Sequence, residues 1–246
     1  MTVQTTSVQT ADASVALIRN WPLTLFSAAL LLLLVGLGCW QLQRAGEKAA
    51  LTAAIDTRLA AQPRNPSTLA QLQRYSPVRL QGHYTDERYY LDNRTRNGSA
   101  GYEILQVFIA ADQRWLINRG WVAAGNDRDV LPAVQWPRAA KVITGFLYPV
   151  SASTASEKSV AMRIQNLDRG FTAPLRLAHP HWNIRLSADS DTALVTDWQL
   201  LNFPPQRHIA YAVQWFAMAA ALAILWLYAA TGLRDWLKNN NYSLKR

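Results

Sequence analysis

Two long apolar runs stand out from the hydrophobic pattern, one near each end of the chain. The second run, Ile209 to Ala230, contains no charged residue. As an α-helix it would extend about 33 Å, enough to cross a hydrocarbon core of roughly 30 Å. The first run, Leu23 to Cys39, is also uncharged and becomes just long enough to span when Trp40 is included. The pattern therefore predicts transmembrane helices over residues 21–40 and 208–230.

Aromatic residues mark the ends of both runs. Trp21 and Trp40 bracket the first run, and Trp226 lies near the end of the second. Indole rings favour the bilayer interface, so these positions support two retained spans. A lipoprotein cleavage site at Cys39 is the alternative for the first run, but such a site requires a large aliphatic residue where Gly36 stands.

Basic residues predict the orientation of the two spans. Only Arg207 immediately precedes the second span, whereas the segment after it carries Arg234, Lys238, Lys245 and Arg246. The positive-inside rule then places the C-terminus in the cytoplasm, although the first span, preceded by Arg19 alone, has the opposite bias. Because long loops translocate largely regardless of charge, we expect residues 41–207 to form an extracytoplasmic domain. Disordered residues 1–20 and residues 231–246 would be cytoplasmic tails.

The same layout limits the compartment and the partners. No Arg- and Ser-rich transit peptide is evident, which favours a bacterial inner membrane with a periplasmic domain over a mitochondrial inner membrane. The single cysteine, Cys39, excludes disulfides and a Cys-x-x-Cys-His haem attachment motif. The net charge of +9 suits membrane lipids or an acidic partner, and the compartment argues against nucleic acid.

Between the spans the hydrophobic period changes. Residues 41–61 are rich in Ala, Leu, Lys and Glu and are expected to continue the first helix. From Tyr75 onward, alternation of polar and apolar residues predicts about seven strands: 78–84, 87–93, 102–109, 114–118, 141–148, 162–167 and 193–201. A turn at 84–86 would join the first two as a hairpin. We expect a β-rich α+β domain with one or two helices, for which a partly closed antiparallel barrel is one arrangement.

The chain offers few residues that point to an enzyme. No nucleophile elbow, phosphate loop, dinucleotide fingerprint or zincin helix is present. The pair His179 and His181 fits a surface turn better than a zinc site, because no third ligand lies nearby in sequence, and His83 fits a structural role in a strand. A membrane-anchored enzyme would need a polar pair or triad that the sequence does not show, so we predict no enzymatic activity.

His208 differs from the other histidines because it stands at the start of the second span. Tyr211 and Trp215 follow it at helical spacing and provide flat rings on the same face. A neutral imidazole beside a bilayer is one of the few side chains that ligate haem iron axially, and Arg207 would pair with a propionate. Trp40, Gln41 and Arg44 leave the membrane at the same level on the first span. The alternative is that His208 and its neighbours are ordinary interfacial anchors.

Several short motifs, in order and spacing, resemble a known family. They are Gly38-Cys39-Trp40-Gln41-Leu42-Gln43-Arg44, Pro77-Val78-Arg79-Leu80-Gln81-Gly82-His83-Tyr84, Gly101-Tyr102-Glu103-Ile104, Asn118-Arg119-Gly120-Trp121-Val122 and His208-Ile209-Ala210-Tyr211-Ala212-Val213-Gln214-Trp215-Phe216. Over nearly its whole length the chain resembles the surfeit-locus protein one family, the Shy-type assembly factors of cytochrome c oxidase. It departs from the family at Ala123, where proline is frequent, and at Gln206-Arg207, where asparagines are frequent.

The resemblance implies a function in respiratory chain biogenesis. Members have two spans around a domain outside the inner membrane and assist haem a delivery to, or insertion into, subunit I of the haem-copper oxidase. Carried over, the suspected haem a and metal ligand is His208, and the candidate cofactor-binding residues beside it are Trp40, Arg44, Tyr211, Gln214 and Trp215. The implied partners are subunit I and other oxidase assembly factors. Gly120 and Trp121 are expected to determine the fold.

Two other functions remain open at this point. The first is a membrane chaperone that binds no haem and stabilises partly built subunit I through contacts with its spans. The second is a two-span extracytoplasmic sensor, which would require an output domain after Ala230, where the printed sequence has too few residues for one.

Overall fold

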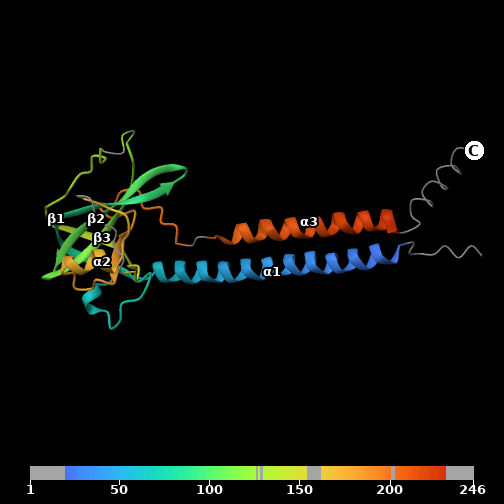
Figure 1. Cartoon of the computed structure of the whole chain (residues 1–246). Helices are drawn as coiled ribbons and strands as arrows, with labels where there is room; N and C mark the ends of the chain where they lie inside the picture. Colours follow the sequence, from blue (N-terminus) through green and yellow to red (C-terminus); the bar gives the residue numbers. More distant parts are fainter. Residues whose placement is uncertain (1–19, 126, 128–129, 154–161, 201–202, 231–246) are drawn as a thin grey trace, which may run out of the picture. The chain divides into compact units, whose positions relative to one another are not determined.

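The structure is a computed structural model that describes residues 20–125, 127, 130–153, 162–200 and 203–230 (Figure 1). Its elements are α1 (Trp21–Leu59), η1 (Pro66–Thr68), β1 (Pro77–Arg96), β2 (Ser99–Ala110), β3 (Gln113–Ala123), β4 (Lys141–Pro149), β5 (Arg163–Ile164), α2 (Arg169–Thr172), η2 (Ala173–Leu175), β6 (Trp182–Leu186) and α3 (Pro205–Ala230). Of the two predicted tails, residues 1–19 and 231–246 lie outside the described residues. The chain forms two compact units, one of residues 1–50 and 201–246 and the other of residues 51–200.

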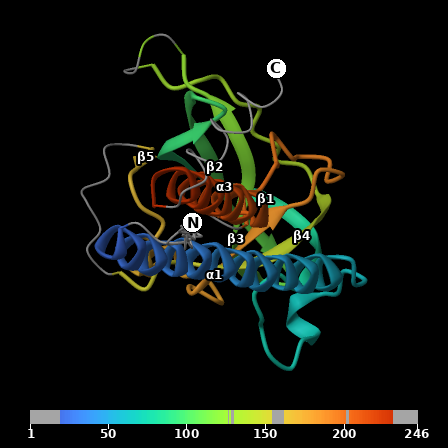
Figure 2. The same cartoon turned by 90° about the vertical axis from the view of Figure 1, so that its right-hand side faces the viewer.

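In the first unit, α1 and α3 lie side by side and run antiparallel (Figures 1 and 2). Near one end of the pair, the Trp226 indole Nε1 donates a hydrogen bond of 3.1 Å to Thr24 Oγ1. Near the other end, His208 forms a hydrogen bond with Gln41. Helix α1 continues without a break to Leu59, as its Ala- and Leu-rich composition predicted.

Small residues let the two helices approach closely. Within this unit the buried positions recur at heptad-like intervals and are Ser27, Leu34, Gly38 and Ala45 in α1, and Ala212 and Ala219 in α3. At Gly38 an added Cβ would lie 2.5 Å from Cε1 of the Phe216 ring. The glycine therefore makes room for the ring, as small residues commonly do between membrane helices.

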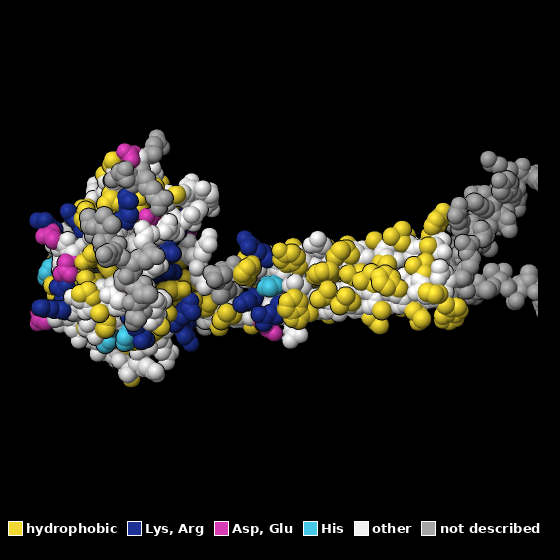
Figure 3. Space-filling view, viewed as in Figure 1, with side chains coloured by type: hydrophobic (Ala, Val, Ile, Leu, Met, Phe, Trp, Pro, Cys, Tyr) yellow, Lys and Arg dark blue, Asp and Glu magenta, His cyan; other side chains and the backbone are white. Residues whose placement is uncertain are grey.

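The outward faces of both helices remain apolar. Only 17% of the most apolar stretch of α1 and 11% of that of α3 are buried. Hydrophobic side chains cover most of the length of the pair (Figure 3). A helix that buries so little apolar surface is no core helix of a water-soluble domain. Both helices are long and apolar enough to cross a membrane, as predicted.

The second unit is built on a six-stranded sheet with the order β2-β3-β6-β4-β1-β5, in which β1 also pairs with β2. Most neighbouring strands are antiparallel, but β1–β5 and β3–β6 are parallel. The prediction of a β-rich domain is therefore confirmed, but its pairing is not antiparallel throughout, and the domain is sheet-rich without being a closed barrel. Strand β5 has only two residues and ends the sheet.

Strand β1 changes partner after its first six residues. Residues 77–82 pair with β4, and residues 83–96 pair with β2. At the change, a Cβ on Gly82 would lie 1.9 Å from the carbonyl oxygen of Ile109, so only glycine lets the strands come this close. The expected hairpin at residues 84–86 is wrong, because β1 passes through this region with a register shift between Tyr84 and Arg88.

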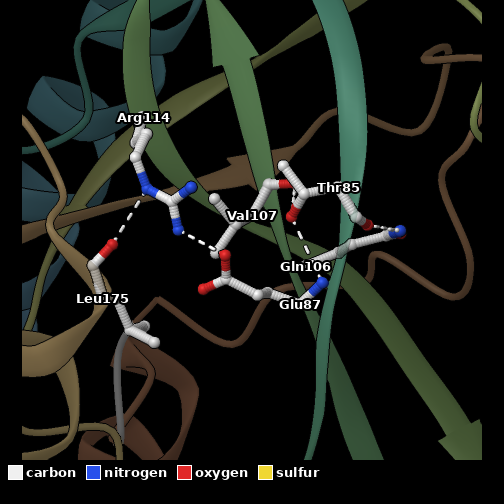
Figure 4. Close-up of polar contacts among 6 residues, drawn as sticks. All are labelled: Thr85, Glu87, Gln106, Val107, Arg114 and Leu175. Atoms are coloured by element: carbon white, nitrogen blue, oxygen red, sulfur yellow. Dashed lines mark hydrogen bonds and ion pairs between the residues drawn. The ribbon is translucent and has the colours of Figure 1, made fainter.

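Local hydrogen bonds support the irregular part of β1 (Figure 4). The Thr85 hydroxyl donates to the Val107 carbonyl at 3.3 Å, and the Gln106 amide donates to the Thr85 carbonyl at 2.9 Å. Arg114 Nη2 reaches Glu87 at 2.6 Å and its Nε donates to the Leu175 carbonyl at 3.0 Å. The first two contacts give hydrogen-bond partners to backbone carbonyls beside the register shift, and the Arg114 contacts link β3 to β1 and to η2.

The other strand predictions are mostly confirmed, with two errors. Strands β2, β3 and β4 contain the predicted runs 102–109, 114–118 and 141–148, whereas only Arg163–Ile164 of the run 162–167 is a strand. Residues 193–200 form no strand, although Val195 makes one bridge to Trp121. Strand β6 was not predicted, although its Ile184 and Leu186 are buried in the main core.

The main core of the sheet domain is apolar and continuous. It joins residues from β1, β2, β3, β4 and β6: Val78, Leu80, Tyr84, Phe108, Ala110, Trp115, Ile117, Ile143, Leu147, Ile184 and Leu186. Because these strands contribute to one cluster, a change at the β1 crossing should weaken the whole domain.

We expect Gly82→Ala to lower the free energy of unfolding by about 2–4 kcal/mol, because the new methyl group collides with backbone that has no room to move. Urea unfolding followed by tryptophan fluorescence measures the change. Gly125→Ala is the control, since the nearest atom to its added Cβ lies 3.9 Å away. Equal midpoints for the two variants would contradict this account of the crossing.

Candidate functional site

The predicted site begins with His208 in the first turn of α3. The helix starts at Pro205, whose fixed φ and missing N–H suit a first helical position. The Arg207 N–H donates to the Pro204 carbonyl at 3.1 Å and closes the first turn. His208 is half-buried and falls on the side of α3 that faces α1.

A hydrogen bond across the helix pair orients the His208 ring. Its Nδ1 lies 2.8 Å from Oε1 of Gln41 on α1. Because an amide oxygen only accepts, Nδ1 carries the proton and the lone pair of the neutral ring lies on Nε2. His208 Nε2 is buried and has no hydrogen-bond partner. An oriented imidazole with an unused nitrogen is the form in which histidine binds metals.

His208 has the chemistry of a haem ligand, but access to its Nε2 is restricted. Nε2 is covered by protein atoms, so an iron atom would reach it only after the ring turns or its neighbours separate. No group of three or more His, Cys, Asp or Glu side chains suitable for a metal occurs in the described part of the chain. His208 thus offers one imidazole nitrogen, Nε2, to an iron atom.

The other predicted site residues differ in burial and in the direction of their side chains. Trp215 is half-buried on the side of α3 that contains Ala212 and Ala219. The side chains that point outward are Trp40 and Tyr211, each 51% exposed, together with Gln214. Arg44 Nη1 is paired with Glu47 Oε2 at 2.6 Å on its own helix. Their roles in binding a cofactor stay predictions.

Gln41 was expected at the same level as His208 but not among the cofactor-binding residues, although it forms the contact that orients His208. The available signal was its position one turn after Gly38, on the same face as Ala45.

His179 lies in the sheet domain, where its ring packs against Trp115 with centroids 4.8 Å apart.

The Asn118–Trp121 motif organises the sheet domain. Gly120 has a φ of +117°, and a Cβ there would lie 2.6 Å from the Val195 carbonyl oxygen. The Trp121 indole donates to the Arg94 carbonyl at 2.8 Å. Arg119 donates to the Thr192 carbonyl at 3.0 Å and to another backbone carbonyl. Burial lowers the pKa of Arg119, and the nearby Tyr84 opposes that shift. These contacts give the motif a structural role.

The helix pairing yields a direct test. We expect cysteines at positions 41 and 208, in a Cys39→Ser background, to be joined efficiently by a short bifunctional maleimide, because the two native side chains are in contact. Gel mobility after proteolysis within the sheet domain measures the cross-link. The control pairs position 208 with position 43, whose native side chain is exposed. Equal cross-linking of both pairs would contradict the observed packing.

Comparisons with known proteins agree with this architecture. The SURF1 family model matches residues 28–220, which include most of both helices and the whole sheet domain. The Cytochrome oxidase assembly protein SHY1 of Saccharomyces cerevisiae is 33% identical over 95 residues, which are 35% of this chain and 24% of that protein. The chain thus matches about a quarter of the length of this curated relative. Because the family model covers most of the chain, the expected resemblance is confirmed, and the chain belongs to the SURF1 family.

Proposed function

We propose that the protein is an assembly factor for cytochrome oxidase that holds haem a at His208, beside the contact between α1 and α3, before the haem enters subunit I. One observation carries the haem-binding part: Gln41 fixes the His208 ring so that its buried Nε2 is free of hydrogen bonds. The assembly function is supported by membership of the SURF1 family and by the similarity to the yeast oxidase assembly protein.

The proposed binding depends on what each side chain does. When bound, haem a would supply an iron atom and a hydrophobic macrocycle. His208 Nε2 would hold the iron, while Gln41 accepts the hydrogen bond from Nδ1–H and keeps the ring in the required tautomer. Trp215 and Tyr211 would lie against the macrocycle. Arg207, or Arg44 after leaving Glu47, would pair with a propionate.

Binding through one imidazole suits transfer better than storage. His208 alone would hold haem a less tightly than a site that offers more or stronger ligands. The exposed apolar faces of α1 and α3 would keep the haem in the bilayer during this exchange. The proposal contains no enzymatic step.

The proposed location follows from the two helices and the charges beyond them. We infer that α1 and α3 cross a bacterial inner membrane, with the sheet domain in the periplasm and the C-terminus in the cytoplasm. Subunit I and other assembly factors would meet the protein at the membrane. The outward faces of the helices also suit a chaperone that contacts subunit I without binding haem, which is the second candidate function.

Replacing His208, the proposed iron ligand, distinguishes haem delivery from a contact chaperone. In a haem a-producing bacterium that lacks its own family member, His208→Ala should reduce the haem a content of subunit I about tenfold or more while the variant accumulates normally. Haem extraction from purified oxidase measures this content. His83→Ala is the control, because His83 is an exposed strand residue of the sheet domain. Full haem a content with His208→Ala would contradict haem delivery and favour the contact chaperone.

A further inference from the structure

A polar cavity lies in the sheet domain and involves none of the residues that pair α1 with α3. It has a volume of about 350 Å³. Of the residues that the structure describes, three arginines line it: Arg74 before β1, Arg94 on β1 and Arg185 on β6, with Glu103 on β2 as the single acidic side chain among them. The three cations and one anion of this described lining leave two positive charges in one small cavity.

Arg185 is held firmly but is not neutralised. Its guanidinium carbon lies 3.7 Å from the centroid of the Tyr148 ring and 4.8 Å from that of Trp198. Its Nε is buried and has no hydrogen-bond partner. Burial lowers the pKa of Arg185, and the carboxylate of Glu103 opposes this shift. The guanidinium is thus positioned by aromatic rings, and its Nε–H makes no hydrogen bond.

Arg94 and Arg74 complete the cationic lining. Arg94 Nε is likewise buried without a partner, while its backbone carbonyl accepts from the Trp121 indole and fixes this part of β1. Arg74 Nη2 donates to the Tyr148 hydroxyl at 2.8 Å. Leaving a buried guanidinium N–H unpaired is costly, so two such groups in one cavity require an explanation.

The acidic and amide groups of the cavity do not supply the missing acceptors. Glu103 Oε2 accepts from Asn118 Nδ2 at 2.6 Å, and the described residues show no ion pair between Glu103 and the three arginines. Asn183 is 1% exposed, and its Nδ2 donates to the Tyr148 carbonyl at 3.0 Å. Asn183 Oδ1 has no partner. The cavity therefore presents unused cationic donors together with one unused neutral acceptor.

We propose that this cavity binds a phosphomonoester, with the phosphate oxygens on Arg74, Arg94 and Arg185 and a ligand hydroxyl donating to Asn183 Oδ1. A dianionic phosphate matches the two excess positive charges, and guanidinium groups bind phosphate oxygens in bidentate geometry. A monocarboxylate would leave one charge unmatched. The same group occurs on soluble metabolites and on lipids such as phosphatidate, and both sources present the same chemistry to the cavity.

Calorimetric titration of the full-length protein in detergent at about pH 8, where a phosphomonoester is dianionic, tests the proposal. The ligands are inorganic phosphate, glycerol 3-phosphate and phosphatidate in mixed micelles, with succinate as a dicarboxylate comparison. We expect saturable one-site binding of a phosphomonoester and at least tenfold weaker binding by Arg94→Met. Binding of glycerol 3-phosphate supports a soluble source, and binding of phosphatidate alone supports a lipid source.

A matched variant distinguishes an effect on ligand binding from an effect on folding. Arg79→Met makes the same change on the same strand at an exposed position outside the cavity, and should bind like the unchanged protein. Without ligand, Arg94→Met should melt no lower than the unchanged protein, because it removes an unpaired buried group. At the same ligand concentration, the rise in melting temperature should be smaller in Arg94→Met than in the unchanged protein. No saturable phosphomonoester binding, equal binding by Arg94→Met, or equally tight binding of succinate would overturn the proposal.

Discussion

The close approach of α1 and α3 is the constraint on which the candidate haem site depends. Gly38 gives the Phe216 ring the space it needs, and this packing brings Gln41 within hydrogen-bond distance of His208. A bulkier residue at position 38 would separate the helices and leave the imidazole without its partner. The orientation of one ring nitrogen thus follows from the absence of a side chain one turn away.

Buried polar groups in this protein follow two patterns. Arg119 is almost fully buried, yet it donates to two backbone carbonyls and contributes to the fold. His208, Arg94 and Arg185 instead have buried nitrogens without partners. Satisfied buried groups stabilise a structure, whereas unsatisfied ones cost stability unless a ligand completes them. This contrast separates the structural motif around Trp121 from the two places where we propose ligands.

Helical features were predictable from the sequence because uncharged runs of sufficient length have few alternatives. Strands with strong alternation, such as β2, were predictable for the same reason. The partner change of β1 was not, because it depends on the space at Gly82 rather than on a local pattern. His208 was found from its position at a helix start, but its contact with Gln41 requires knowing how two distant helices pack. The arginine cavity gathers residues from separate strands and left no signal along the chain.

The visible and electron paramagnetic resonance spectra of the purified protein test haem ligation by His208 most directly. The protein would be isolated in detergent from a host that makes haem a, beside His208→Ala and Gln41→Leu. The account predicts haem a bound through one imidazole, lost in His208→Ala and weakened about 10–100-fold in Gln41→Leu, because the second residue only orients the first. Identical haem spectra in the unchanged protein and His208→Ala, or no haem in either, would contradict it.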